Sequence, residues 1–214
     1  MDQVFWIVGW IIYLTLFSIA LWGAYCCVAV WRRVAEKRFT SETAQFEFLE
    51  ALERPLSKGD MESAAALCEE DARAVPQLAL LAFHNRQIGF AKIRQLVEDR
   101  FQRDILADLE HRMTWVHTVI KSAPMVGLFG TVVGMMGAFG KLGSGDGSVE
   151  APALAQDIML ALITTASGLA IAIPLIIAVA AVNIRIRKME ELTLAGINRL
   201  LESVHKSLLL GKKR

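Results

Sequence analysis

Charged residues are missing from three long stretches of this 214-residue sequence. Residues 4–31, 122–140 and 158–184 contain no Asp, Glu, Lys, Arg or His. Soluble helices seldom remain uncharged for so long, and a hydrophobic content of 54% is high for a soluble domain of this size. A hydrocarbon core about 30 Å thick is crossed by roughly 20 helical residues. The sequence therefore predicts an all-α integral membrane protein with three transmembrane helices.

Cysteine and histidine are scarce, and neither is spaced for metal binding or catalysis. The four histidines lie outside the uncharged stretches without clustering, and the three cysteines lack disulfide or metal-ligand spacing (Cys26, Cys27 and Cys68). An intramembrane enzyme would need a Ser/Lys, Asp/Asp or His-rich metal site within the spans, so we expect no enzyme, metal or cofactor. A net charge of +1 and the lack of a basic, aromatic-interleaved patch do not indicate nucleic-acid binding.

Basic residues are distributed unevenly around the spans. None precedes the first span, and the short second connection contains only Lys141, whereas "WRRVAEKR" follows the first span and "RIRK" follows the third. Because cytoplasmic loops carry an excess of Lys and Arg, the N-terminus is predicted outside, with 32–121 and the tail in the cytoplasm. We expect no cleaved signal peptide, since a basic n-region is missing and the apolar run is too long.

The cytoplasmic residues predict helices broken by turn residues, forming a solvated bundle that holds the spans together. Gly59 is a break, Asp60 is the expected N-cap of the next helix, and Pro76 marks another break. Apolar residues at helical spacing over about 77–113 predict one long helix that continues into the second span. The tail continues the third span as an amphipathic helix, whose basic end either contacts anionic lipid headgroups or is an ordinary solvated terminus.

Small residues dominate the second span, "GLFGTVVGMMGAFG". The Gly-Lys-Ser/Thr ending of a phosphate-binding loop is missing and no strand precedes the stretch, so that interpretation fails. Gly127, Gly130, Gly134 and Gly137 are three or four residues apart and share one helix face. We expect this face to pack closely against another helix.

Hydroxyl groups occur at matching depths in the second and third spans, which a short connection makes antiparallel neighbours. Thr131 lies about 15 Å below Lys141, and Thr165, next to Thr164, lies about 12 Å below Asp157, at 1.5 Å per residue. Two interpretations remain open. Each hydroxyl bonds its own i−4 carbonyl, or the hydroxyls form a polar ring that lines a pore.

Asp157 is the carboxylate nearest a span. The third helix is long enough to hold it at the outer interface, either as a solvated residue or as a carboxylate where ions are taken up. The spans contain no other ionisable group, so a proton path would need a titrating carboxylate from a partner.

Two stretches, "APMVGLFGTVVGMMGAFGKL" and "LAQDIMLALITTASGLAIAIPLIIA", resemble the signature helices of the MotA/TolQ/ExbB proton channel family. The three-span layout and "GDMESAAALCEEDARAVP" resemble its ExbB and TolQ branch. The motif Thr-Thr-x-x-Gly-Leu-x-x-Ala-Ile-Pro includes Gly168 and Pro174, to which we assign helix packing. The resemblance implies that Thr131 and Thr165 are the pore threonines, with Thr164 beside them.

The resemblance also implies a pentameric ring in the bacterial inner membrane. Two single-span partners similar to ExbD or TolR would enter the pore and each supply an aspartate, and a periplasm-spanning protein similar to TonB or TolA would receive the work. In this scheme the predicted segments are a periplasmic N-terminus with the first transmembrane helix (1–31), a cytoplasmic helical region (32–121), the second transmembrane helix (122–142), a periplasmic loop (143–154), the third transmembrane helix (155–184) and a cytoplasmic helix (185–214).

The sequence departs from the branch at one position. ExbB and TolQ usually carry a glutamate five residues before the second threonine, where this chain has Leu160. Asp157, one turn earlier, is a candidate replacement. We expect an ExbB-like motor subunit that serves TonB-dependent transport; a TolQ-like or other paralogous subunit and a non-conducting membrane scaffold are the alternatives.

Overall fold

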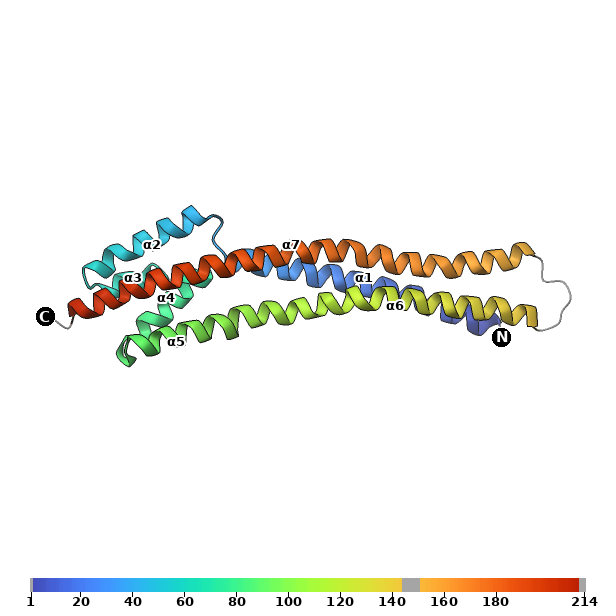
Figure 1. Cartoon of the computed structure of the whole chain (residues 1–214), viewed down its shortest axis with the longest axis horizontal. Helices are drawn as coiled ribbons and strands as arrows, with labels where there is room; N and C mark the ends of the chain where they lie inside the picture. The colour runs from blue at the N-terminus through green and yellow to red at the C-terminus, as the bar shows by residue number, and fades with distance from the viewer. Residues whose placement is uncertain (1, 144–150, 212–214) are drawn as a thin grey trace. The chain divides into compact units, whose positions relative to one another are not determined.

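The computed structural model describes residues 2–143 and 151–211, and within them the chain is helical and contains no strand. The all-α class is therefore confirmed. The elements, shown in Figure 1, are α1 (Asp2–Lys37), α2 (Glu42–Ser57), α3 (Met61–Ala66), α4 (Ala74–His84), the 3₁₀ turn η1 (Arg86–Ile88), α5 (Phe90–Arg100), the π-helix η2 (Phe101–Leu106), α6 (Ala107–Gly143) and α7 (Ala151–Gly211).

Three of the described helical stretches are long and apolar enough to cross a membrane, as predicted. They lie within Ile7–Ser57, Phe90–Gly143 and Leu154–Lys206. Only 22%, 22% and 17% of their most apolar windows are buried by the chain itself. Most of this apolar surface must therefore be covered by lipid or by other protein. The protein is a multi-pass membrane protein. The predicted spans 122–142 and 155–184 lie inside the longer helices α6 and α7.

The chain divides into two compact units, which we describe separately. The membrane unit comprises Met1–Ala29 and Arg112–Ala181, and contains the apolar parts of α1, α6 and α7. The extramembrane unit comprises Val30–His111 and Val182–Arg214.

The extramembrane unit has its own hydrophobic core, formed by α2, α3, α4 and the last part of α7. Its buried side chains include Leu49, Leu52, Phe83, Leu200 and Val204. These residues recur at helical spacing on amphipathic helices, so each helix buries one apolar face against the others. The unit is thus a helical bundle built around α7.

Polar contacts join α2 to α7 beside this core. The Gln45 amide donates to the Leu192 carbonyl at 2.6 Å. The Arg199 guanidinium makes a two-pronged contact with Glu53 at 2.7 and 3.0 Å and lies 4.3 Å from the ring centroid of Phe46. These hydrogen bonds hold the pKa of the Glu53 carboxyl below its usual value.

The expected helix punctuation at Gly59 and Asp60 is confirmed. Gly59 adopts φ +78°, a conformation that favours glycine, and ends the turn after α2. The Asp60 carboxylate accepts the backbone N–H of Ser63 at 3.0 Å and caps α3. Pro76 lies in the first turn of α4, which begins at Ala74, so the break comes just before the proline.

The expectation of one continuous helix from about residue 77 into the second span was wrong. α4 ends at His84, where the Asn85 side chain donates to the Leu81 carbonyl at 2.9 Å. Gly89 has φ +89°, and the helix that continues through η2 and α6 begins at Phe90. The helical spacing of apolar residues continues across this break. It gives no sign of the backbone turn at Asn85 and Gly89, so the break was not predicted. Ile88, an apolar residue within the predicted stretch, is 43% exposed.

Candidate functional site

Glycines bring the backbones of α6 and α7 into close contact in the membrane unit. A Cβ added at Gly127 would lie 2.6 Å from the carbonyl oxygen of Thr164, and one at Gly168 would lie 2.5 Å from that of Ala123. Further along the seam, a Cβ at Gly134 would lie 2.6 Å from the Ala161 side chain. Small residues of this kind let helices associate in lipid, where the hydrophobic effect between helices is absent.

The other predicted packing residues differ in their surroundings. A Cβ at Gly130 would lie 2.5 Å from the Thr164 hydroxyl oxygen, so Gly130 belongs to the same seam. Gly137 lines a cavity beside the seam. Pro174 lies within α7 and is exposed, so the described residues of the membrane unit do not enclose it.

The three threonines meet in the seam. Thr131 on α6 and Thr165 on α7 are hydrogen-bonded through their hydroxyls. The Thr165 hydroxyl lies 3.0 Å from the Gly127 carbonyl oxygen, and the Thr164 hydroxyl lies 2.9 Å from the same oxygen. Thr131 and Thr165 therefore lie at the same depth in the structure, as the sequence predicted.

The interpretation that each hydroxyl bonds its own i−4 carbonyl describes the contacts only in part. Thr131 Oγ1 lies 3.3 Å from its own i−4 carbonyl, that of Gly127, but also 3.2 Å from the Ala161 carbonyl across the seam. A hydroxyl has one proton to donate, so these contacts are alternatives between which it can rotate. Thr164 is only 5% exposed, while Thr131 and Thr165 are half-buried. The seam therefore contains a connected group of hydroxyls and carbonyls with several arrangements of its protons.

Asp157 does not stand alone. Its carboxylate accepts a hydrogen bond from Lys141 Nζ at 2.7 Å, which links the start of α7 to the end of α6. The Lys141 and Asp157 side chains are 46% and 27% exposed, so both charges remain accessible from outside the protein. In the sequence, Lys141 and Asp157 marked the outer surface and Asp157 was a candidate for ion uptake, but the opposite charges 16 positions apart were not recognised as a pair.

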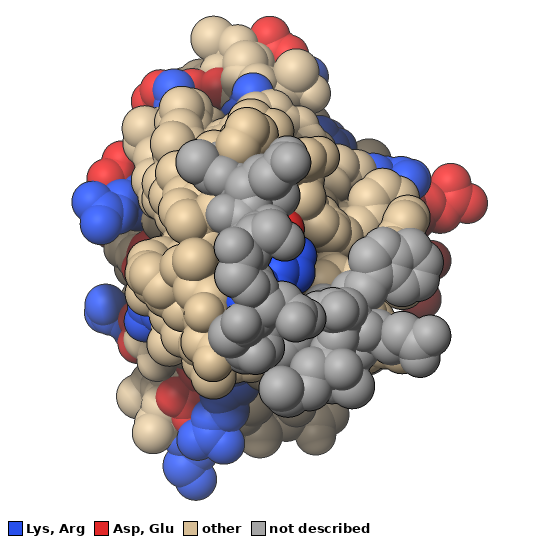
Figure 2. Space-filling view, turned by 90° about the vertical axis from the view of Figure 1, so that its right-hand side faces the viewer, with Lys and Arg blue, Asp and Glu red and all other residues tan. Residues whose placement is uncertain are grey.

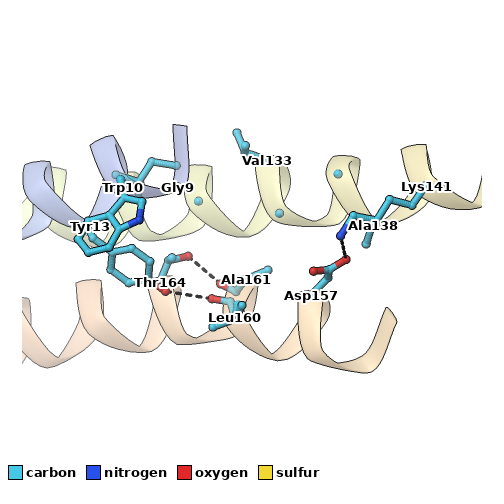
Figure 3. A pocket seen from close by; sticks show the side chains of 14 residues that line it. Gly9, Trp10, Tyr13, Val133, Ala138, Lys141, Asp157, Leu160, Ala161 and Thr164 are labelled. Carbon is cyan, nitrogen blue, oxygen red and sulfur yellow. Dashed lines mark hydrogen bonds and ion pairs between the residues drawn. The ribbon is translucent and has the colours of Figure 1, made fainter. Parts of the chain in front are cut away.

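A cavity of about 600 Å³ lies next to the seam, between α1, α6 and α7. Figure 3 shows the Lys141–Asp157 pair at one end and the rings of Trp10 and Tyr13 from α1 at the other. The Tyr13 hydroxyl donates to the backbone carbonyl of Leu160 at 3.4 Å. The remaining lining is mostly small or apolar and includes Gly130, Val133, Gly134, Gly137, Ala138, Ala161 and Thr164.

The contribution of α1 was missed at the level of sequence. No residue of the first span was predicted to belong to the site. A weak signal was available, since Tyr13 is one of only two tyrosines in the chain and lies within an uncharged stretch.

The described residues contain no group of three or more His, Cys, Asp or Glu side chains that could hold a metal ion. The chemical groups that the membrane unit does bring together are hydroxyls, backbone carbonyls and one ion pair. Such groups can orient water or a proton beside a titrating group.

These features define a class: an α-helical multi-pass membrane protein whose second and third spans enclose a hydroxyl-bearing, glycine-packed seam. The sequence profile of the MotA/TolQ/ExbB proton channel family matches residues 77–193, more than half of the chain. The chain belongs to this family.

Individual relatives carry ExbB and TolQ names. The biopolymer transport protein ExbB of Xanthomonas campestris is 30% identical over 80% of this chain and 71% of its own length. A putative ExbB-like 2 protein of Helicobacter pylori is 40% identical over 42% of this chain, and TolQ of the Tol-Pal system of Haemophilus influenzae is 40% identical over 40%. This chain spans 57% of the Helicobacter relative and 37% of the TolQ relative.

Proposed function

We propose that this protein is the ring-forming subunit of a proton-driven membrane motor of the ExbB type. Five copies would surround a pore lined by α6 and α7, and two copies of a single-span partner similar to ExbD would lie inside it. Protons would pass from the periplasm to the cytoplasm, and the motion would be transmitted to a TonB-like protein that energises transport across the outer membrane.

This proposal rests on the paired hydroxyls of Thr131 and Thr165. Both side chains are half-buried, hydrogen-bonded to each other, and adjacent to the Gly127 and Ala161 carbonyls. Residues 122–140 and 158–184 contain no ionisable side chain, so these hydroxyls can position a proton but cannot bind and release one near neutral pH. A carboxylate from a partner helix would supply that step.

The ExbB assignment is supported by the extent of the Xanthomonas match, which covers 80% of this chain, compared with 40% for the Haemophilus TolQ match. A TolQ-like role in a Tol-Pal-type or other paralogous system is the second candidate. Complementation separates them, because an ExbB-type subunit restores TonB-dependent uptake to a strain that lacks ExbB but does not restore envelope integrity to one that lacks TolQ.

We place the protein in the bacterial inner membrane with its N-terminus in the periplasm and its C-terminus in the cytoplasm. The asymmetry of basic residues around the spans supports this orientation. A reporter fusion at each terminus tests it.

Native mass spectrometry of the complex, purified with its co-expressed single-span partner, tests the motor proposal. Five copies of this chain with two partner helices are expected. A complex that never takes up a partner helix would leave the pore without a titrating group, and a non-conducting scaffold would then be the better description.

A further inference from the structure

The cavity between α1, α6 and α7 has a lining that divides into an apolar body and one charged end. Its volume of about 600 Å³ lies within the range of roughly 300–1,000 Å³ that is usual for small-molecule sites. Among the described residues that line it, Lys141 and Asp157 are the charged ones, and both line the same end (Figure 3). The cavity thus has the amphipathic pattern of a molecule with an apolar tail and a polar head.

The polar groups in the body of the cavity are engaged within the protein. The Thr164 hydroxyl lies 2.9 Å from the Gly127 carbonyl and 2.7 Å from the Ala161 carbonyl. The Tyr13 hydroxyl is hydrogen-bonded to the Leu160 carbonyl. A guest in the body of the cavity therefore meets an apolar surface, and polar recognition is concentrated at the ion pair.

Gly9 on α1 leaves part of this space open. A Cβ built at Gly9 has no atom within 4 Å, although the residue lines the cavity. Several glycines elsewhere in the membrane unit are required for close helix contact, as at Gly134, where a Cβ would meet Ala161 at 2.6 Å, whereas Gly140 on α6 has open space like Gly9 but does not line the cavity. The glycine at position 9 has no such packing reason within the described residues, and its effect is to keep the cavity wide.

We infer that this cavity binds one acyl chain of a zwitterionic phospholipid of the phosphatidylethanolamine class. The tail lies along the apolar lining, the phosphate accepts from Lys141 Nζ, and the ammonium group donates to the Asp157 carboxylate. The helices that form the cavity are membrane-spanning by length and composition, so hydrocarbon chains are the available guests. This inference does not depend on the motor function proposed above.

Charge complementarity selects this headgroup. The opposite charges of Lys141 and Asp157 are 2.7 Å apart and partly exposed, so an anionic headgroup that approaches the lysine also meets the carboxylate. A headgroup with both a phosphate and an N–H donor matches both charges. Figure 2, which views the end where α6 stops and α7 begins, shows blue and red atoms among tan ones near the middle of that face. Because lipid tails are as apolar as the lining, selectivity must come from the headgroup rather than from the tail.

The experiment uses the full chain, purified with its native assembly in mild detergent, delipidated, and titrated with defined lipids under native mass spectrometry. The probes are phosphatidylethanolamine, phosphatidylcholine, which keeps both charges but has no N–H donor, and the anionic phosphatidylglycerol. We expect phosphatidylethanolamine to bind about tenfold more tightly than either, as the loss of one charge-assisted hydrogen bond implies.

Three variants locate the binding. Gly9→Leu fills the cavity and should abolish binding of phosphatidylethanolamine, whereas Gly140→Leu, at an exposed α6 position where a Cβ also meets nothing within 4 Å, should bind it normally. Lys141→Gln together with Asp157→Asn should remove the preference among the three lipids.

Equal affinity for the three lipids in the unmodified protein, or normal binding by Gly9→Leu, would overturn the inference. A third result would also overturn it: the unmodified protein retains no lipid, and Gly9→Leu fails to assemble. In that case the occupant of the cavity would be a second copy of the chain. None of these results alters the subunit ratio expected for the unmodified protein with its partner, so failure of this inference is distinguishable from failure of the proposed function.

Discussion

The hydroxyls of Thr131 on α6 and Thr165 on α7 are hydrogen-bonded to each other across a seam that glycines keep narrow. The two residues are 34 positions apart in the chain and reach the same depth from opposite directions. Because each hydroxyl also reaches a backbone carbonyl, the pair can exchange hydrogen-bond partners without moving its backbone.

Thr131→Val and Thr165→Val should each lower proton flux about tenfold, because the loss of one hydrogen-bonding group beside the moving proton raises its barrier by about 1.4 kcal/mol. The protein should still fold, since an interhelical hydrogen bond in a membrane contributes only about 0.6 kcal/mol. Flux is measured with a pH-sensitive dye in vesicles that contain the protein and its partner.

Thr15→Val is the matched control for these variants. Thr15 lies in α1, and its hydroxyl donates to the i−4 carbonyl of Ile11 at 2.7 Å. Unchanged flux in all three variants would argue for a non-conducting scaffold.

Asp157→Asn should reduce proton-driven activity roughly tenfold if this carboxylate raises the local proton concentration where ions are taken up. Activity is measured as partner-dependent growth under conditions that require the motor. Activity equal to that of the unmodified protein would assign Asp157 only to the ion pair with Lys141.

Gly127→Ala should destabilise the packing of α6 on α7 by about 1–3 kcal/mol, because its Cβ would lie 2.6 Å from a backbone carbonyl that cannot move aside freely. Gly140→Ala is the control, since its Cβ meets nothing within 4 Å and alanine favours the helix. Thermal unfolding in detergent compares the two. Similar melting temperatures would show that the seam has more room than the structure indicates.

The contact between α2 and α7 should weaken at acidic pH. Hydrogen bonds from Arg199 lower the folded-state pKa of Glu53 below the ordinary value of 4.5. The stabilisation is therefore present above pH 4.5 and is lost as the pH falls through the lower, folded-state pKa. Both side chains are about a third exposed, so the contribution is at most about 1 kcal/mol.

Thermal unfolding followed by circular dichroism at pH 7 and at pH 3 to 4 measures this effect. Glu53→Gln should lower stability at pH 7 and show a smaller loss on acidification than the unmodified protein. Glu47→Gln, at an exposed position of the same helix, should leave the pH dependence unchanged. A pH dependence that Glu53→Gln does not alter would contradict the assignment.

Cys68 should resist alkylation in the folded protein. Its side chain is fully buried, and burial raises the pKa of the Cys68 thiol to about 12, so little of the reactive thiolate forms near neutral pH. In a Cys26→Ala/Cys27→Ala background, maleimide should react with Cys68 only when denaturant unfolds the extramembrane unit. Rapid labelling without denaturant would show that this core opens easily. Ser57→Cys, at an exposed position, supplies the accessible reference.

Local features of the sequence were reliable where the physical cause is local. Asp60 caps α3 because a carboxylate two to three residues before free backbone N–H groups accepts their hydrogen bonds in almost any context. The prediction of a continuous helix from about residue 77 was wrong because apolar spacing does not reveal where a helix is interrupted. Apolar spacing reports which face is buried, whereas the break at Asn85 and Gly89 depends on side-chain capping and a positive φ.

The sequence by itself determined the three apolar spans, the all-helical class and the depth of the threonines, because length, charge exclusion and a rise of 1.5 Å per residue need no tertiary information. Only the tertiary structure decided that Lys141 pairs with Asp157 and that α1 closes a cavity beside the seam with Trp10 and Tyr13. Those contacts depend on how the helices are rotated about their axes, which is set by packing against neighbours and not by the residues of one helix alone.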